Sequence, residues 1–167
     1  MSCYFDAMLR FAFLLIFLAA CAPQATLTIS SVPDLNTLSG QPFYLPDETS
    51  GAAVAADSAL LSGASVTITG NGVSGSAQLL LEQALEVAQP GRSYRVIPLR
   101  LELPPAEPGF YLLLFEGRGD LLDQRAAVYL GQEQPTGLSY ENAQVIVQLA
   151  SGVRTFDIFA GELQAAE

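Results

Sequence analysis

Few side chains in this sequence could transfer protons or attack a substrate. It has no histidine and no lysine, which removes Ser-His-Asp and Cys-His nucleophiles, histidine-ligated zinc, Schiff bases and the P-loop lysine. Paired carboxylates are the general acid–base chemistry that remains. The candidates are Asp47, Glu48, Asp57, Glu116, Asp120 and Asp123. None lies in a glycosidase or aspartic-protease motif, so we predict a protein that is not an enzyme and needs no cofactor.

Calcium binding is a second chemistry that carboxylates offer. Glu116, Asp120 and Asp123 flank a glycine turn, and Ca²⁺ takes hard oxygen ligands. Their spacing is not that of an EF-hand, and a hairpin turn with solvated carboxylates accounts for it, so no metal site is predicted. Arg118-Gly119-Asp120 spells an integrin-binding tripeptide, but three-residue matches often arise by chance.

Exposed aromatic rings could stack on sugars. The candidates are Tyr44, Tyr94, Tyr111, Tyr129 and Tyr140. The chain has no tryptophan, and most of these tyrosines fall within strand patterns, where packing is the expected role. A surface β-sandwich module that binds a carbohydrate or another ligand is therefore kept as the alternative function.

The N-terminal residues are the strongest indication of where the protein lies. An apolar run, residues 11–20, is too short for the roughly 20 residues that span a bilayer, but suits a secretory signal peptide. It ends in Leu18-Ala19-Ala20-Cys21, which resembles the lipobox of bacterial lipoproteins. The resemblance implies that a peptidase recognises Leu18, Ala19 and Ala20, cleaves after Ala20, and leaves Cys21 diacylated. The alternatives are an uncleaved anchor or an ordinary signal peptide, and translation could start at Met1 or Met8.

Lipidation would make the membrane a partner of this chain. Two or three acyl chains anchor a protein stably, because each buried CH₂ contributes about 0.8 kcal/mol. By resemblance to the sorting rule of enteric bacteria, Ala22 after the cysteine points to the outer membrane of a bacterial cell envelope, facing the periplasm or the surface. Cys3 would leave with the signal peptide and Cys21 would carry lipid, so no thiol remains for a disulfide or a zinc site.

The charge balance argues against a polyanionic partner. The net charge is −10, and losing Arg10 and Asp6 with the signal peptide does not change it. Phosphate binding requires clustered basic residues, whereas the remaining arginines are scattered among carboxylates. Nucleic acid is therefore excluded, and so is an electrostatic membrane patch.

Alternating polar and apolar residues between Gly and Pro turns predict a series of short strands. The expected strands are 25–30, 64–69, 93–103, 109–116, 122–130, 143–149 and 153–159. Residues 77–88 fit a helix or a strand, and we favour the strand because the neighbouring segments are strands. Residues 31–63 are rich in Pro, Gly and Ser and are expected to be a long loop-rich excursion.

Seven or more short strands predict an all-β fold, a single β-sandwich at residues 25–167 after a signal peptide (1–20) and a lipidated tether (21–24). Residues 90–115 resemble the late strands of immunoglobulin-like or transthyretin-like domains of bacterial envelope proteins. The Cys…Trp…Cys pattern of antibody domains is absent.

Residues 109–116 are apolar on both faces, although a sandwich strand normally packs only one face into the core. The outer face carries Tyr111, Leu113 and Phe115. Either the 31–63 excursion covers it, or it is the docking surface of a protein partner. The expected function is that of a lipid-anchored cell-envelope protein that acts as a non-catalytic interaction or assembly module.

Overall fold

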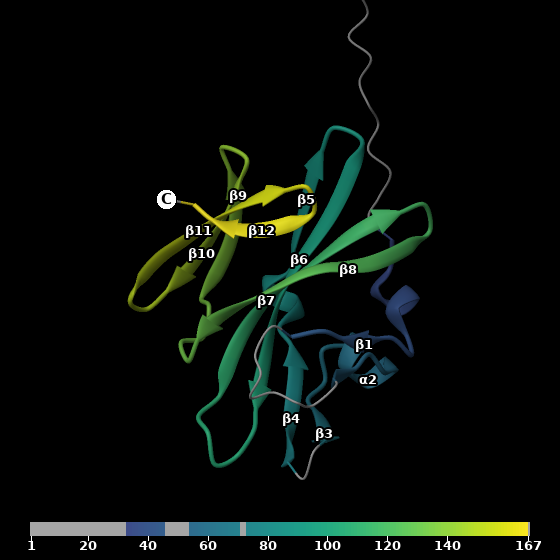
Figure 1. Ribbon diagram of the computed structural model, residues 1–167, viewed down its shortest axis with the longest axis vertical. Helices are drawn as coiled ribbons and strands as arrows, with labels where there is room; N and C mark the ends of the chain where they lie inside the picture. Colours follow the sequence, from purple (N-terminus) through teal and green to yellow (C-terminus); the bar gives the residue numbers. More distant parts are fainter. Residues whose placement is uncertain (1–32, 46–53, 71–72, 167) are drawn as a thin grey trace, which may run out of the picture.

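The computed structural model describes residues 33–45, 54–70 and 73–166, and these form an all-β, sandwich-like fold of antiparallel sheets (Figure 1). The predicted fold class is therefore confirmed. The strands are β1 (Pro42–Phe43), β2 (Val54–Ala55), β3 (Val66–Gly70), β4 (Val73–Leu79), β5 (Leu85–Gln89), β6 (Arg92–Glu102), β7 (Gly109–Arg118), β8 (Leu121–Gly131), β9 (Gly137–Glu141), β10 (Gln144–Leu149), β11 (Gly152–Phe159) and β12 (Glu162–Ala165). Three short helical segments accompany them: η1 (Leu35–Leu38), α2 (Ser58–Leu61) and η2 (Leu81–Gln83).

The larger sheet has the order β3-β4-β6-β7-β8. β5 pairs with the first half of β6, and β4 pairs with its second half on the same edge. Between them the chain leaves this edge at η2, where Leu80 N–H donates to the Pro98 carbonyl at 2.9 Å. Pro98 has no N–H to donate to a neighbouring strand. The gap between β4 and β5 therefore lies opposite the one residue of β6 that could not complete the hydrogen-bond ladder. β4 and β5 are thus two halves of one interrupted strand.

The smaller sheet, with the order β12-β11-β10-β9, packs on one face of the larger one. Phe110, Leu112 and Leu114 of β7 are buried against apolar side chains of this sheet, among them Val147 and Phe156. This packing is the arrangement expected of a sandwich, in which every second residue of a strand faces inward.

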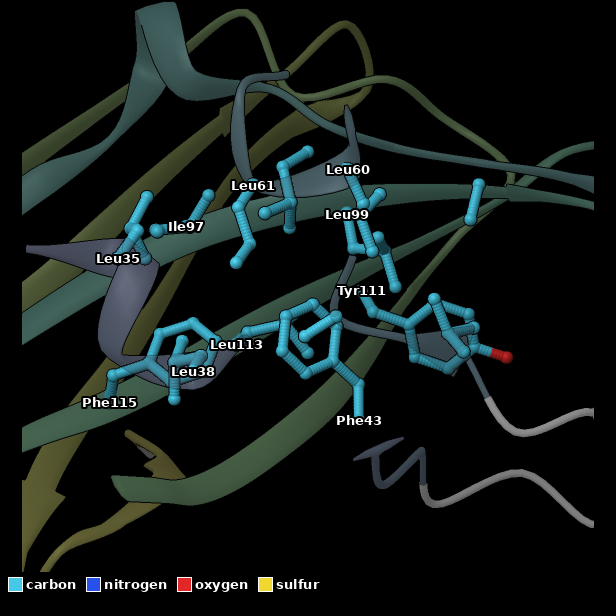
Figure 2. Close-up of a cluster of buried hydrophobic side chains, with 14 of the residues drawn as sticks. Leu35, Leu38, Phe43, Leu60, Leu61, Ile97, Leu99, Tyr111, Leu113 and Phe115 are labelled. Atoms are coloured by element: carbon cyan, nitrogen blue, oxygen red, sulfur yellow. The ribbon is translucent and has the colours of Figure 1, made fainter. Parts of the chain in front are cut away.

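The opposite face of the larger sheet lies beneath η1, β1, β2 and α2, which together we call the cover. Tyr111, Leu113 and Phe115 of β7 lie in one row below the cover, as Figure 2 shows. The ring of Phe43 from β1 lies 5.6 Å from that of Phe115, centroid to centroid. Leu60 of α2 is fully buried in the same cluster. β7 is therefore buried on both faces, and the molecule has three layers.

Polar contacts attach the cover to β8, the neighbouring outer strand. The Gln124 side chain accepts from Tyr44 N–H at 2.9 Å and donates to the Tyr44 carbonyl at 2.7 Å. Leu122 N–H donates to the Thr37 hydroxyl at 3.2 Å. Within the cover, Asp57 caps α2 by accepting from Leu60 N–H at 2.8 Å.

Most predicted strands after residue 63 coincide with observed ones, and three expectations change. Residues 77–88 are mainly strand, interrupted by η2. Residues 33–45 and 54–61 of the expected loop-rich excursion contain ordered elements. The strands β9 and β12 were not predicted, because they have only five and four residues, over which the alternation is too short to stand out. The predicted strand 25–30 lies outside the described residues.

Candidate functional site: an arginine cluster around Glu116

Glu116 is the one buried charged residue in the described part of the chain, and three arginines surround its carboxylate. Its Oε2 lies 3.3 Å from Arg125 Nε and 3.3 Å from Arg118 Nη2. Its Oε1 lies 3.5 Å from Arg92 Nη1. Arg118 Nε is also 3.5 Å from Asp123 Oδ2. We call Arg92, Arg118 and Arg125 the arginine cluster.

The antiparallel sheet brings these residues together from three neighbouring strands. Arg92 begins β6 and Arg118 ends β7, so both lie at the same end of the paired strands, where Ser93 is opposite Gly117. Both arginines adjoin glycine turns. A position beside a glycine turn at a strand end is a signal in the sequence that the two arginines lie close together. The prediction that the arginines are scattered did not take this signal into account.

Arg125 owes its place to a bulge in β8. Leu114 pairs with Ala126 and Phe115 with Gln124, so the pairing passes over Arg125. A regular strand would set Arg125 opposite Leu114 and direct its charge into the core. The bulge gives that position to Ala126 and leaves Arg125 beside the Glu116 carboxylate, which illustrates how bulges redirect side chains.

The arginine cluster is open to solvent on its outer side. The side chains of Arg92, Arg118 and Arg125 are 49%, 57% and 33% exposed, against 7% for Glu116. Arg92 Nη1 donates a hydrogen bond to the Tyr94 hydroxyl at 3.3 Å. This hydrogen bond is the main reason that the pKa of Arg92 is raised, and the negative charge of Glu116 raises it further. The group therefore stays positively charged at physiological pH.

Several guanidinium nitrogens remain available for a ligand. Arg92 Nη2, Arg118 Nη1 and both Nη atoms of Arg125 make no hydrogen bond or ion pair with the described residues. Planar N–H groups of this kind bind carboxylate or phosphate oxygens, often in pairs. The arrangement can therefore bind an anion, with the buried Glu116 holding the three groups together.

The described carboxylates among those singled out in the sequence each make a contact of another kind or lie exposed to solvent. Glu116 and Asp123 contact arginines, Asp57 is a helix cap, and Asp120 is exposed on the turn. Asp47 and Glu48 lie outside the described residues. Guanidinium groups around Glu116 repel a cation, and no group of three or more potential ligand residues that could hold a metal occurs among residues 33–45, 54–70 and 73–166.

Tyr111, Leu113 and Phe115, the expected partner surface, lie beneath the cover with exposures of 3%, 0% and 0%. The structure therefore contains the first of the two arrangements considered above, in which the chain's own 31–63 excursion covers this face of β7. Phe43 of this excursion packs on this face, whereas the neighbouring Tyr44 is 73% exposed. These three side chains are therefore core residues and do not form a docking surface.

Of the tyrosines considered for sugar stacking, Tyr111 and Tyr129 lie ring to ring with centroids 5.1 Å apart, but only Tyr129 of this pair is exposed. Tyr94 and Tyr111 are buried, and Tyr140 is half-buried and accepts from Gln89 at 3.2 Å. Tyr44 and Tyr129 are exposed, beside separate hollows of about 280 Å³ and 120 Å³. Neither hollow is lined by two exposed rings, so no aromatic platform is formed among these residues.

Leu18, Ala19, Ala20 and Cys21 lie outside the described residues, so the lipobox stays a prediction. In the part of the chain that the structure describes, no helix is long and apolar enough to cross a membrane. No protein-family model, curated protein or solved structure matches the chain. The likeness to immunoglobulin-like or transthyretin-like domains likewise stays a prediction.

Proposed function

We propose that this chain is a lipid-anchored protein of the bacterial cell envelope, in which Cys21 carries the lipid and the β-sandwich is a non-catalytic interaction module. The arginine cluster is its contact with a protein partner, and it binds a carboxylate or phosphate group on that partner. The anchor is supported by the coincidence of an apolar run with Leu18-Ala19-Ala20-Cys21. An outer-membrane location, facing the periplasm or the surface, agrees with Ala22 after the cysteine.

The proposed contact with an anionic partner group is supported by one observation. Guanidinium groups outnumber carboxylates at one point of an otherwise acidic protein. Three positive charges converge on one buried carboxylate, while the chain as a whole has a net charge of −10. Most of the surface therefore repels an anionic group, and this end of the sheet is where such a group finds open N–H donors. Complementarity of this kind favours specificity and fast association.

The cluster is also near the proposed anchor. Pro33, the first described residue, lies against Gly117 at the same end of the strands, on the face of β7 opposite to Glu116 and Arg118. Eleven residues lie between Cys21 and Pro33, and the twelve Cα–Cα steps from one to the other span at most about 43 Å. A partner held at the arginine cluster would therefore lie close to the membrane.

The anchor is tested by intact-mass analysis of the membrane fraction. We expect loss of residues 1–20 and added acyl chains on Cys21. The variant Cys21→Ser should be unprocessed and unacylated. A wild-type protein that retains residues 1–20 without acyl chains would overturn the lipid anchor and leave the arginine contact untouched.

The contact is tested by NMR titration with inorganic phosphate and with acetate, observing the arginine Hε signals. We expect saturable shifts at Arg92, Arg118 and Arg125 that weaken with added salt. Arg118→Gln should weaken them, whereas Arg100→Gln, a matched control on the same sheet with one ion pair to Glu102, should not. Equal, non-saturating shifts of all arginine signals would overturn an anion site.

A further inference from the structure

One outer strand of the larger sheet lacks the features by which proteins protect such edges. The outer strands of the two larger sheets are β3, β5, β8, β9 and β12. Four of them carry charged residues within their bounds, whereas β3, with the sequence Val-Thr-Ile-Thr-Gly, has neither a charge nor a proline. Uncharged edges of high β propensity are usually avoided because they pair with other strands.

Other outer strands also have neighbours on their open side. Arg154 Nη1 donates to the Leu130 carbonyl at 3.0 Å, and η1 and Tyr44 lie along β8. β5 faces β9, where Gln89 donates to the Tyr140 hydroxyl at 3.2 Å. β3 pairs with β4 alone in the described part of the chain, and Figure 1 shows it at the rim of the sheet.

The register of the β3–β4 hairpin determines which backbone groups face outward. Gly70 pairs with Val73 across a two-residue turn, and such a turn is flanked by a hydrogen-bonded pair. Hydrogen-bonded pairs alternate along an antiparallel ladder, so Ile68 directs its N–H and C=O toward β4. Thr67 and Thr69 direct theirs toward the open edge.

We propose that β3 pairs antiparallel with β3 of a second copy of this chain, about a two-fold axis at Ile68. Thr67 of each copy then faces the second copy's Thr69, and the outward N–H and C=O groups of both residues are satisfied in four reciprocal hydrogen bonds. The threonine side chains form cross-strand pairs on one face, and the two Ile68 side chains continue the apolar face.

A second copy fits this edge better than an unrelated strand because Thr-Ile-Thr has the same sequence in both directions. The pairing is isologous, as in most homodimers. No charge opposes the approach at the edge itself, despite the net charge of −10. Two five-residue edges bury less than the roughly 1,000 Å² typical of stable interfaces, so the dimer is weak and depends on concentration.

Sedimentation equilibrium of the full chain in density-matched detergent tests the proposal. We expect a monomer–dimer equilibrium for the wild type. The double variants Thr67→Glu/Thr69→Glu and Thr67→Lys/Thr69→Lys each place like charges opposite one another and should stay monomeric. Mixing the two variants in equal amounts should restore dimers, because each lysine then faces a glutamate.

The matched control is Gln148→Glu/Gln164→Glu, which adds the same charge at exposed positions of the smaller sheet and should dimerise like the wild type. Thr67 and Thr69 are exposed, so thermal unfolding of the variants should resemble that of the wild type. A wild type that stays monomeric at millimolar concentration would overturn the proposal. Dimers of the Glu variant alone, or a mixture that stays monomeric, would overturn it as well.

Discussion

The Glu116 carboxylate lies 3.3 Å from Arg125 Nε because a bulge adds one residue to β8 at this point. The extra residue moves Arg125 away from Leu114 and out of the core. The apolar packing between the two larger sheets therefore ends where the charged end of the sheet begins, and a single irregularity in β8 marks the boundary.

Glu116→Gln should lower the free energy of unfolding by about 1.5–3 kcal/mol, because a buried carboxylate loses its ion pairs with three arginines and the charge-assisted hydrogen bonds from Arg118. Urea denaturation followed by circular dichroism measures the change. Glu102→Gln is the control, since Glu102 forms one half-exposed ion pair with Arg100 and should change stability by less than about 1 kcal/mol. An equal effect of both variants would contradict a structural role for Glu116.

Phe43→Ala and Phe115→Ala should each lower stability by about 3–5 kcal/mol, because both rings are buried between the cover and β7. A double-mutant cycle should give a coupling of about 0.5–1.5 kcal/mol for the two rings. Phe159→Ala, at a ring that is 67% exposed, serves as the control and should have little effect. A Phe115→Ala variant as stable as this control would mean that the cover is open in solution.

Gln124→Glu should loosen the attachment of the cover to β8. A carboxylate can still accept from Tyr44 N–H but has no N–H to donate to the Tyr44 carbonyl. Hydrogen exchange should show faster exchange of the Tyr44 amide, with a stability loss of about 0.5–1.5 kcal/mol. Gln134→Glu, at an exposed position, should leave this amide unchanged, and unchanged exchange in both variants would exclude the attachment.

Glu133 provides a test of pH dependence. Hydrogen bonds from the Ser151 side chain and backbone N–H, the latter at 3.0 Å, hold the pKa of Glu133 below its ordinary value of 4.5. The resulting stabilisation is therefore complete above about pH 4.5 and is lost as the pH falls through the folded-state pKa. Ser151→Ala should raise the pKa of Glu133 in an NMR titration, while the distant Ser62→Ala should not. An unchanged pKa in Ser151→Ala would contradict this assignment.

Strand alternation and glycine turns were sufficient to predict the all-β class and most strands from β3 onward. The two apolar faces of residues 109–116 even indicated that β7 needs a second cover. Sequence alone left open whether the cover was this chain or a partner, because that depends on contacts between distant residues such as Phe43 and Phe115. The arginine cluster was missed partly for the same reason, since Arg92 approaches Glu116 only after β6 and β7 pair, and partly because the glycine turns beside Arg92 and Arg118 were not compared.

The cover precedes in sequence the strands that it protects. A chain made from its N-terminus therefore produces η1, β1, β2 and α2 before β7 exists, and the apolar cluster on which these short elements pack is incomplete until residue 115 has been made. Contacts this distant in sequence also form slowly. We expect the first half of the chain to stay unfolded until β7 has been made. In the exported protein that we propose, this delay would keep the chain in a form suited to passage through a membrane pore before the domain closes.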